Sequence, residues 1–263
     1  MKKVLTIAGS DCSGGAGIQA DIRTITAHGH YAMSAITALT AQNTQGVTNI
    51  SIVSPDFLAD QLDAILSDIM PDAVKIGMVC SGQLAAVIAD KLVQYDVKNI
   101  VFDPVMVSTS GAALMDSSSA AEILQSIVPL SAVITPNIPE AETILGTEIK
   151  NNMDCVKAAQ KLSRDLHTSV LLKGGHLEAN SNDLLFSGGK IINYRGDRID
   201  TKNTHGSGCV LSSAIACGLA EGKELNAAIK SAKEFITGAI KSSANQEIGN
   251  GNGPVDPTFR IKA

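Results

Sequence analysis

Short apolar runs alternate with amphipathic stretches along most of the chain. The runs predict buried strands at Val4–Ala8, Met33–Leu39, Ala73–Met78, Asn99–Asp103, Ala132–Thr135 and Ser169–Lys173. Between most of them apolar residues recur at helical spacing, and Ser54-Pro55 is a favourable start for one such helix. This alternation predicts right-handed βαβ units and a mostly parallel sheet with helices on both faces.

The pattern changes after residue 183. Leu184–Phe186 and Ile191–Tyr194 flank Gly188-Gly189, which predicts a hairpin at a sheet edge. Two helices are then expected, roughly at Cys209–Ala220 and Asn226–Ser242. Because the chain contains no linker, repeat or low-complexity tract, we expect one domain over residues 1–263.

The composition narrows the class of protein. Apolar residues make up 44% of the 263 residues but aromatic residues only 3%, which suits a core of aliphatic side chains between parallel strands and helices. The net charge of −5 and the absence of a basic stripe argue against nucleic-acid binding. No apolar run approaches the roughly 20 residues that span a bilayer, and Asp11 ends the first run too early for a signal peptide. We therefore expect a cytoplasmic protein without membrane contact.

The five cysteines do not form a recognisable framework. They are Cys12, Cys80, Cys155, Cys209 and Cys217. An odd number without a CxxC pair predicts reduced thiols rather than disulfides or a zinc site.

The segment with the clearest chemical pattern is Asn203–Val210. Gly206 and Gly208 flank Ser207 directly before a predicted helix, so that backbone N–H groups and the helix N-terminus can form an anion site. Cys209 would lie at that terminus, where its pKa is expected to fall below the free value of about 8.5. The alternative is a plain glycine turn followed by a buried cysteine.

A second glycine-rich segment allows another interpretation. Gly15–Ala20 fits the dinucleotide-binding pattern G-x-G-x-x-A, which would indicate a Rossmann dehydrogenase. That fold places an acidic residue about 20 positions further on to bind the ribose. Leu39–Asn43 contains no acid, which disfavours this alternative.

Motifs along almost the whole chain resemble one family. These are Thr6–Asp11 with Ser13–Asp21, Ser34–Thr44, Lys75–Met78, Asp103–Val107, Thr135–Glu140, Lys173–His176, His205–Cys209 and Ile248–Pro254. Together they are similar to the hydroxymethylpyrimidine kinase/phosphomethylpyrimidine kinase branch of the ribokinase superfamily. In that superfamily Thr-x-Gly-x-Gly marks the anion hole, and most members carry Asp where this chain has Cys209.

The resemblance implies a ribokinase-like three-layer α/β/α fold with a central mostly parallel sheet. It implies a kinase that uses ATP and Mg²⁺ to phosphorylate 4-amino-5-hydroxymethyl-2-methylpyrimidine (HMP) and then HMP phosphate, in thiamine biosynthesis. Small molecules would be its only ligands, and homodimers are usual in the family. Within this family Gly206, Ser207 and Gly208 would hold the migrating phosphoryl group. Cys209 would take the proton of the hydroxymethyl group in the first step only, because a phosphate acceptor needs no base.

The same resemblance assigns residues to the pyrimidine. They are Gly9, Asp11, Gln42, Met78 and Val105. The carboxamide of Gln42 has a donor and an acceptor that match an aminopyrimidine edge, and Asp11 would contact the hydroxymethyl group. A solvated or backbone-bonded Gln42 and an Asp11 that caps a turn are the alternatives.

The phosphate side is implied by further motif residues. Asn137, Lys173 and Thr204 would bind nucleotide phosphates, and Asp103 and Glu140 would hold Mg²⁺ largely through water. Taken alone, Glu140 also fits a carboxylate in the first turn of a helix, and Lys173 fits a lysine in solvent. His176 and His205 receive no role.

Several positions depart from the family pattern. Ser207 replaces Thr, Cys12 replaces Pro, Asn250 and Asn252 replace His, and Thr109 replaces Lys. These departures keep a vitamin B6 kinase of the same branch open as the alternative substrate assignment. A non-catalytic pyrimidine-binding protein is a further alternative, which loss of Asn137, Glu140 or Cys209 would have favoured.

Overall fold

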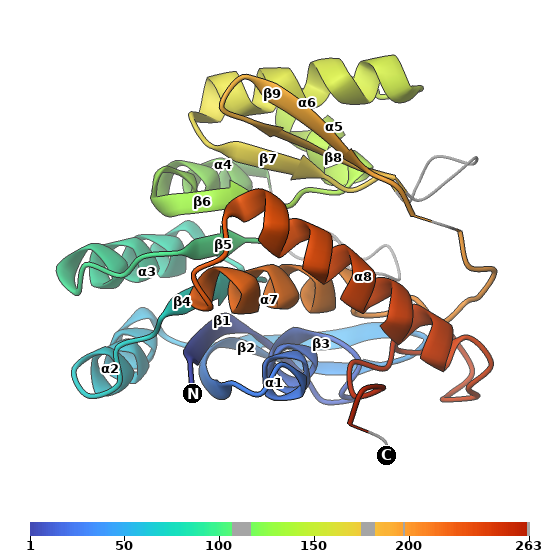
Figure 1. Ribbon diagram of the computed structural model, residues 1–263. Helices are drawn as coiled ribbons and strands as arrows, with labels where there is room; N and C mark the ends of the chain where they lie inside the picture. Colours follow the sequence, from blue (N-terminus) through green and yellow to red (C-terminus); the bar gives the residue numbers. More distant parts are fainter. Residues whose placement is uncertain (107–116, 175–181, 197, 262–263) are drawn as a thin grey trace.

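The computed structural model describes residues 1–106, 117–174, 182–196 and 198–261. Within these residues nine strands form one sheet in the order β3-β2-β1-β4-β5-β6-β7-β8-β9, with helices on both faces (Figure 1). The strands are β1 (Lys3–Asp11), β2 (Tyr31–Asn43), β3 (Gly46–Ile52), β4 (Ala73–Ile76), β5 (Ile100–Phe102), β6 (Ser131–Ile134), β7 (Ser169–Leu172), β8 (Asp183–Ser187) and β9 (Lys190–Tyr194). The helices are α1 (Gly17–Ala27), α2 (Pro55–Leu66), α3 (Gly82–Gln94), α4 (Ser117–Ile127), α5 (Ile138–Leu145), α6 (Asn152–Leu166), α7 (Ser207–Ala220) and α8 (Leu225–Ser243), with a 3-10 turn at Val128–Leu130.

The middle of the sheet is parallel and its edges are antiparallel. Strands β2, β1, β4, β5, β6 and β7 pair in parallel, whereas β3 pairs antiparallel with β2 and the β8–β9 hairpin continues antiparallel from β7. The predicted three-layer α/β/α fold with a mostly parallel sheet is therefore confirmed.

Two apolar clusters explain why the central strands are apolar at every position. In β7, Val170 and Leu172 face the cluster beneath α2–α6, while Leu171 faces the cluster beneath α1, α7 and α8. Successive side chains of a strand point to opposite faces, so a sheet covered on both faces needs apolar residues throughout.

Most predicted elements are present with small shifts of their ends. The hairpin at residues 183–194 and both closing helices are confirmed. At the start of α2, the Ser54 hydroxyl accepts a hydrogen bond from the Phe57 amide at 3.2 Å, as expected for an N-cap.

One strand was not predicted from the sequence. Strand β3 lies at the edge of the sheet, where Thr48, Asn49 and Ser51 are exposed. None of its residues is fully buried, and its alternation of Ile50 and Ile52 with Asn49 and Ser51 is too short to stand out in the sequence.

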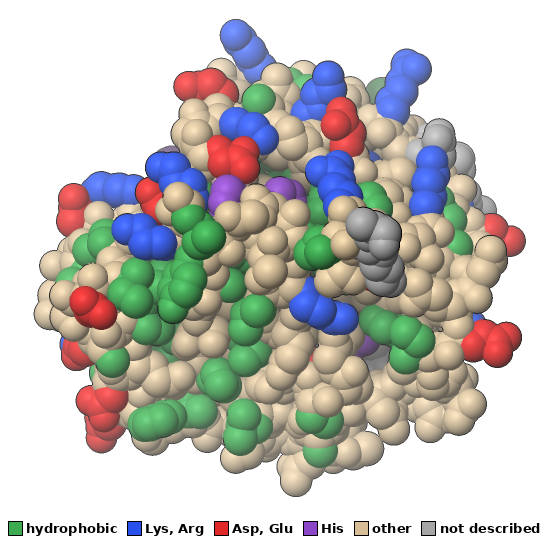
Figure 2. All heavy atoms as spheres, turned by 60° about the horizontal axis from the view of Figure 1, so that its bottom comes forward, with side chains coloured by type: hydrophobic (Ala, Val, Ile, Leu, Met, Phe, Trp, Pro, Cys, Tyr) green, Lys and Arg blue, Asp and Glu red, His purple; other side chains and the backbone are tan. Residues whose placement is uncertain are grey.

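Charged side chains of both signs are interspersed on one face of the molecule. Figure 2 shows Lys and Arg beside Asp and Glu there, with apolar groups exposed between them. Exposed apolar residues of the β2–β3 edge include Leu39 and Ile52. Among the described helices, none is long and apolar enough to cross a membrane.

A buried ion pair links four elements next to the carboxyl ends of the strands. Lys75 of β4 and Asp21 of α1 are both 0% exposed, and Nζ of Lys75 lies 2.8 Å from Oδ2 of Asp21. The same carboxylate accepts hydrogen bonds from the hydroxyls of Thr6 in β1 at 2.6 Å and Ser213 in α7 at 2.8 Å. Burial acts to lower the pKa of Lys75, but the charge and hydrogen bond of Asp21 together with the nearby Cys209 and Asp103 raise it above its usual value, so the ammonium stays charged.

Removing one partner of this pair should destabilise the fold strongly. Lys75→Met leaves a buried carboxylate without its counter-charge, and we expect a loss of about 3–5 kcal/mol in the free energy of unfolding. Urea denaturation measures this loss. Lys98→Met removes an exposed lysine that pairs with Asp96 and should leave the midpoint nearly unchanged. Equal effects of the two substitutions would contradict the structural importance of the buried pair.

Candidate active site

A cavity of about 740 Å³ opens beyond the carboxyl ends of the parallel strands, where ligands bind in open α/β sheets. All the residues assigned from the sequence to catalysis, substrate, phosphate or metal line it. They are Gly9, Asp11, Gln42, Met78, Asp103, Val105, Asn137, Glu140, Lys173, Thr204, Gly206, Ser207, Gly208 and Cys209. The structure thus brings the two groups of predicted residues, for ring and for phosphate, into one space.

The glycine-rich loop before α7 has the backbone of an anion site. Gly206 has φ +79°, and a Cβ at this position would collide with the carbonyl oxygen of Gly15. Contrary to expectation, the amide of Ser207 does not face the cavity as a donor, because it donates to the Thr204 carbonyl at 3.1 Å. The amides of Gly208 and Cys209 have no acceptor within the described residues, as is usual in the first turn of a helix. They are the donors that an anion would meet.

Cys209 carries a neutral thiol in the structure. Burial raises its pKa to about 11, against the opposing influence of the Lys75 ammonium. The Asp21 and Asp103 carboxylates raise it further, while a hydrogen bond from the Gly17 amide acts to lower it. The expected lowering at the helix N-terminus is therefore wrong, because desolvation outweighs the helix dipole here.

A buried carboxylate and a lysine form a second ion pair in the cavity wall. Nζ of Lys173, after β7, lies 2.7 Å from Oδ1 of Asp103, after β5, and Thr135 donates to the same oxygen at 2.9 Å. Burial acts to raise the pKa of Asp103, but the Lys173 and Lys75 cations and these hydrogen bonds hold it below its usual range. A Cβ on Gly208 would lie 3.3 Å from Lys173 Nζ, so this cation adjoins the anion loop.

Glu140 lies on the other side of Lys173 and is nearly as buried as Asp103. Its Oε2 accepts from the Asn137 amide at 2.8 Å and its amide donates to the Asn137 side chain at 2.9 Å, which is a capping box at the start of α5. Burial raises the pKa of Glu140 to about 7, and the Lys173 cation only partly opposes this effect. The two carboxylates near Lys173 thus differ in protonation near neutral pH.

Met78 and Val105 make part of the cavity wall apolar. Met78 and Ala38 form a small cluster against which Val105 packs. A Cβ on Gly9 would lie 2.5 Å from Cε of Met78, so a larger residue there would push the end of the Met78 side chain aside. This surface can lie against the face of a flat ring.

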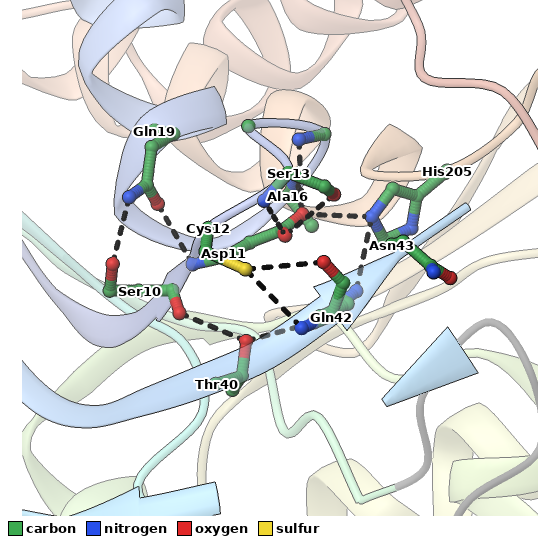
Figure 3. A network of polar contacts seen from close by, with 12 residues as sticks. Ser10, Asp11, Cys12, Ser13, Ala16, Gln19, Thr40, Gln42, Asn43 and His205 are labelled. Atoms are coloured by element: carbon green, nitrogen blue, oxygen red, sulfur yellow. Dashed lines mark hydrogen bonds and ion pairs between the residues drawn. The ribbon is translucent and has the colours of Figure 1, made fainter. Parts of the chain in front are cut away.

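Polar groups meet beside this apolar surface (Figure 3). Oδ2 of Asp11 lies 2.9 Å from Nε2 of His205, and that nitrogen lies 3.2 Å from Nε2 of Gln42. Asp11 also accepts hydrogen bonds from the backbone of Ser13, Gly15 and Ala16, which is the turn role considered from the sequence. Burial acts to raise the pKa of Asp11, but the hydrogen bond with His205, followed by those from Ser13 and the Ala16 amide, holds it below its usual range.

A segment near the C-terminus joins the ring end of the cavity to the anion loop. The amides of Gly251 and Asn252 donate to Thr44, just beyond β2, at 3.1 and 2.9 Å. The amide of His205 donates to the Gly253 carbonyl at 3.0 Å, and the amide of Val255 donates back to His205 at 3.1 Å. We call residues 249–255 the C-terminal clasp.

Some residues of the cavity were not predicted. Lys75 lines its floor, and a single charge inside the apolar run Ala73–Met78 was the available signal. His205 had no assigned role, and nothing in the sequence pairs it with Asp11. The wall formed by α8 and residues 198–202 was also missed. His176 and Thr109 lie outside the described residues.

The fold and this cavity together define the class. Helices cover both faces of a mostly parallel sheet, and a glycine anion loop at α7 lies beside lysines and carboxylates in the cavity. This is the architecture of ribokinase-like small-molecule kinases. The Phosphomethylpyrimidine kinase family model matches residues 11–256, and the chain belongs to this family.

Individual relatives agree with this classification. The chain is 46% identical over 253 residues to a hydroxymethylpyrimidine/phosphomethylpyrimidine kinase of Rhizobium meliloti, covering 95% of each protein. It is 49% identical over 254 residues to the thiamine biosynthesis bifunctional protein ThiED of Geobacter sulfurreducens. That match covers 96% of this chain but 51% of the relative, so the chain spans about half of the longer protein.

Solved structures show the same fold. A phosphomethylpyrimidine kinase from Clostridium difficile is 42% identical with a TM-score of 0.81, over 91% of this chain and all of that one. An ADP complex of Bacillus subtilis pyridoxal kinase is 36% identical with a TM-score of 0.90 over the full length of both chains.

The protonation of Glu140 predicts a pH-dependent difference in stability. Because its pKa is raised from 4.5 to about 7, folding favours the protonated form, and this contribution is lost as the pH rises from 4.5 through 7. Relative to Glu140→Gln, whose carbonyl can keep the capping bond, the wild type should lose about 3 kcal/mol over this range. Urea denaturation at several pH values measures it. A pH-independent difference would contradict the raised pKa.

Proposed function

We propose that the chain transfers the γ-phosphoryl group of ATP to the hydroxymethyl group of HMP, and in a second reaction to the phosphate of HMP phosphate. The observation that carries the proposal is one cavity lined by Gln42 and the apolar side chains of Met78 and Val105 as well as by the anion loop at Gly206–Cys209. The names of the relatives, which are kinases for both substrates, support the same pair of reactions.

The ring would lie between Gly9, Met78 and Val105, with its edge toward Gln42. Asp11 is less available to the hydroxymethyl group than the sequence suggested, because loop amides and His205 already contact its carboxylate. Its contact with the substrate therefore stays a prediction.

The phosphoryl group would be held by backbone donors and a cation. Phosphoryl transfer passes through a loose transition state, so positioning and charge stabilisation supply most of the rate. The amides of Gly208 and Cys209 would bind the migrating group, and Lys173 would contact the phosphate oxygens next to them. Thr204 and Asn137 line the same wall. The space beside α8, near Lys233 and Thr237, would accommodate the rest of ATP.

The residues present fit a hydrated Mg²⁺ better than a protein-enclosed metal. No group of three or more metal-binding side chains occurs among the residues that can be described. Asp103 and Glu140 flank Lys173, and magnesium commonly takes one or two carboxylates besides water and phosphate. When bound, the ion would neutralise charge on the phosphates of ATP.

Cys209 would act as base only in the first reaction. A thiol with a pKa of about 11 is protonated at rest, so it must first release its own proton to water in the open cavity. The thiolate would then accept the hydroxymethyl proton while the substrate oxygen bonds to phosphorus. The nearby Lys75 ammonium stabilises such a thiolate. HMP phosphate, with a second pKa near 6, is largely ionised at pH 7 and needs no base.

A vitamin B6 kinase is the second candidate. The pyridoxal kinase of Staphylococcus aureus in complex with AMP-PCP and pyridoxal is 32% identical to this chain with a TM-score of 0.90. The phosphomethylpyrimidine kinases share more of the sequence, at 40–49% identity. A non-catalytic binding protein is disfavoured because Asn137, Glu140 and Cys209 all line the cavity. A cytoplasmic location and a homodimer stay predictions.

A substrate panel tests the proposal directly. ATP consumption with HMP, HMP phosphate, pyridoxine and pyridoxal should give the highest kcat/KM for the two pyrimidines. A preference for pyridoxal would favour the vitamin B6 assignment, and no turnover of any of these acceptors would refute a kinase of this class.

Cys209 should matter for one reaction more than for the other. In Cys209→Ala we expect kcat/KM for HMP to fall by about 10²–10⁴-fold, the usual effect of a general base, and that for HMP phosphate by less than about tenfold. Cys209→Asp supplies the residue usual in the superfamily and should recover much of the HMP reaction. Equal losses for both acceptors in the alanine variant would leave Cys209 as a packing residue.

A further inference from the structure

Two hydrogen-bond conflicts meet at the carboxamide of Gln42 (Figure 3). The single hydroxyl proton of Thr40 lies between two acceptors, the Ser10 carbonyl at 3.0 Å and Oε1 of Gln42 at 3.2 Å. At the other end, Nε2 of Gln42 lies 3.2 Å from Nε2 of His205. Whether Nε2 of His205 carries a proton decides which atom of the Gln42 carboxamide can face it.

Nε2 of His205 must carry a proton. It lies 2.9 Å from Oδ2 of Asp11, and the low pKa of Asp11 keeps this carboxylate ionised, so it can only accept. A ring nitrogen that donates to Asp11 has no lone pair for the amide of Gln42. Two N–H donors would therefore face each other.

Reversing the carboxamide removes both conflicts at once. The two orientations have nearly the same shape, so hydrogen bonding decides between them. With its oxygen toward His205, Gln42 shares the ring N–H with Asp11. With its nitrogen toward Thr40, Gln42 donates to the hydroxyl, whose proton is then left for Ser10. Each donor now meets an acceptor.

We propose that His205, fixed by Asp11, is a positioning residue that sets the orientation of the Gln42 carboxamide and thereby the specificity for the ring edge. The acceptor oxygen of Gln42 lies on the His205 side and the donor nitrogen on the Thr40 side. One lone pair and one N–H remain for a ligand. A bound ring must present a donor next to His205 and an acceptor next to Thr40.

This orientation of the Gln42 carboxamide fixes which way the HMP ring is turned in the cavity, provided that the proposed function holds. In HMP the amino group lies between ring nitrogen N3 and the hydroxymethyl group. With the amino group at the Gln42 oxygen and N3 at its nitrogen, the hydroxymethyl group lies beyond His205. That is the side of Gly206–Cys209. The opposite carboxamide orientation would turn the hydroxymethyl group away from the anion loop.

The 4-oxo analogue of HMP, 5-hydroxymethyl-2-methylpyrimidin-4(3H)-one, tests the orientation because its ring edge has donor and acceptor exchanged. We expect the wild type to prefer the amino ring by at least about 100-fold in kcat/KM, as for sites built around a specific hydrogen bond. In His205→Met, which has no donor, Gln42 can rotate and the preference should fall at least about tenfold. His205→Gln has a side chain of similar length that keeps an N–H donor. It should restore most of the preference for the amino ring.

A merely structural His205 would give a different result. Both rings would then lose activity together in His205→Met, and the unchanged ratio would overturn the proposal. If the wild type turns over neither ring, the proposed function fails, but the orientation can still be tested.

Neutron diffraction from deuterium-exchanged crystals of the unmodified protein locates the amide deuterons of Gln42, and it does not depend on the folding of a variant. Deuterons on the atom facing Thr40 support the proposal. Deuterons on the atom facing His205 overturn it.

Discussion

The buried charge of Asp21 fixes where helix α7 begins relative to the sheet. Its carboxylate binds Lys75 of β4, Thr6 of β1 and Ser213 of α7, all without contact to water. Since a buried carboxylate is stable only when its hydrogen-bond partners are well positioned, α7 cannot slide along the sheet without withdrawing the Ser213 hydroxyl from Asp21. The first turn of α7 carries the amides of Gly208 and Cys209. The position of the anion loop therefore depends on the buried contacts of Asp21.

Much of the fold could be predicted from the sequence for a simple reason. Strands covered on both faces, such as β4 and β7, must be apolar at nearly every position, and such runs are easy to recognise. Residues at the carboxyl ends of parallel strands gather at one edge of a sheet. Asp103 and Lys173 follow β5 and β7 directly, and Asn137 follows β6 after two residues, so their convergence in one cavity follows from the topology.

The remainder depends on contacts between residues that are distant in the sequence. Strand β3 lies at the sheet edge with no fully buried residue, and its short alternation of Ile50 and Ile52 with polar residues gave too weak a signal. The pKa of Cys209 is set by burial and by Asp21 and Asp103, which its local sequence cannot reveal. The partnership of His205 with Asp11 joins positions 194 residues apart. For these features the residues can be read from the sequence, but the groups that surround them are known only from the folded structure.

The C-terminal clasp has a consequence for biosynthesis. Thr44 and His205 both receive backbone hydrogen bonds from residues 251–255, so the wall between ring site and anion loop is closed by a late part of the chain. On the ribosome the sheet can form from β1 to β9 while this wall is still missing. A nascent chain whose helices up to residue 243 have formed would therefore still have an open substrate site, which closes only once residues 251–255 can reach Thr44 and His205.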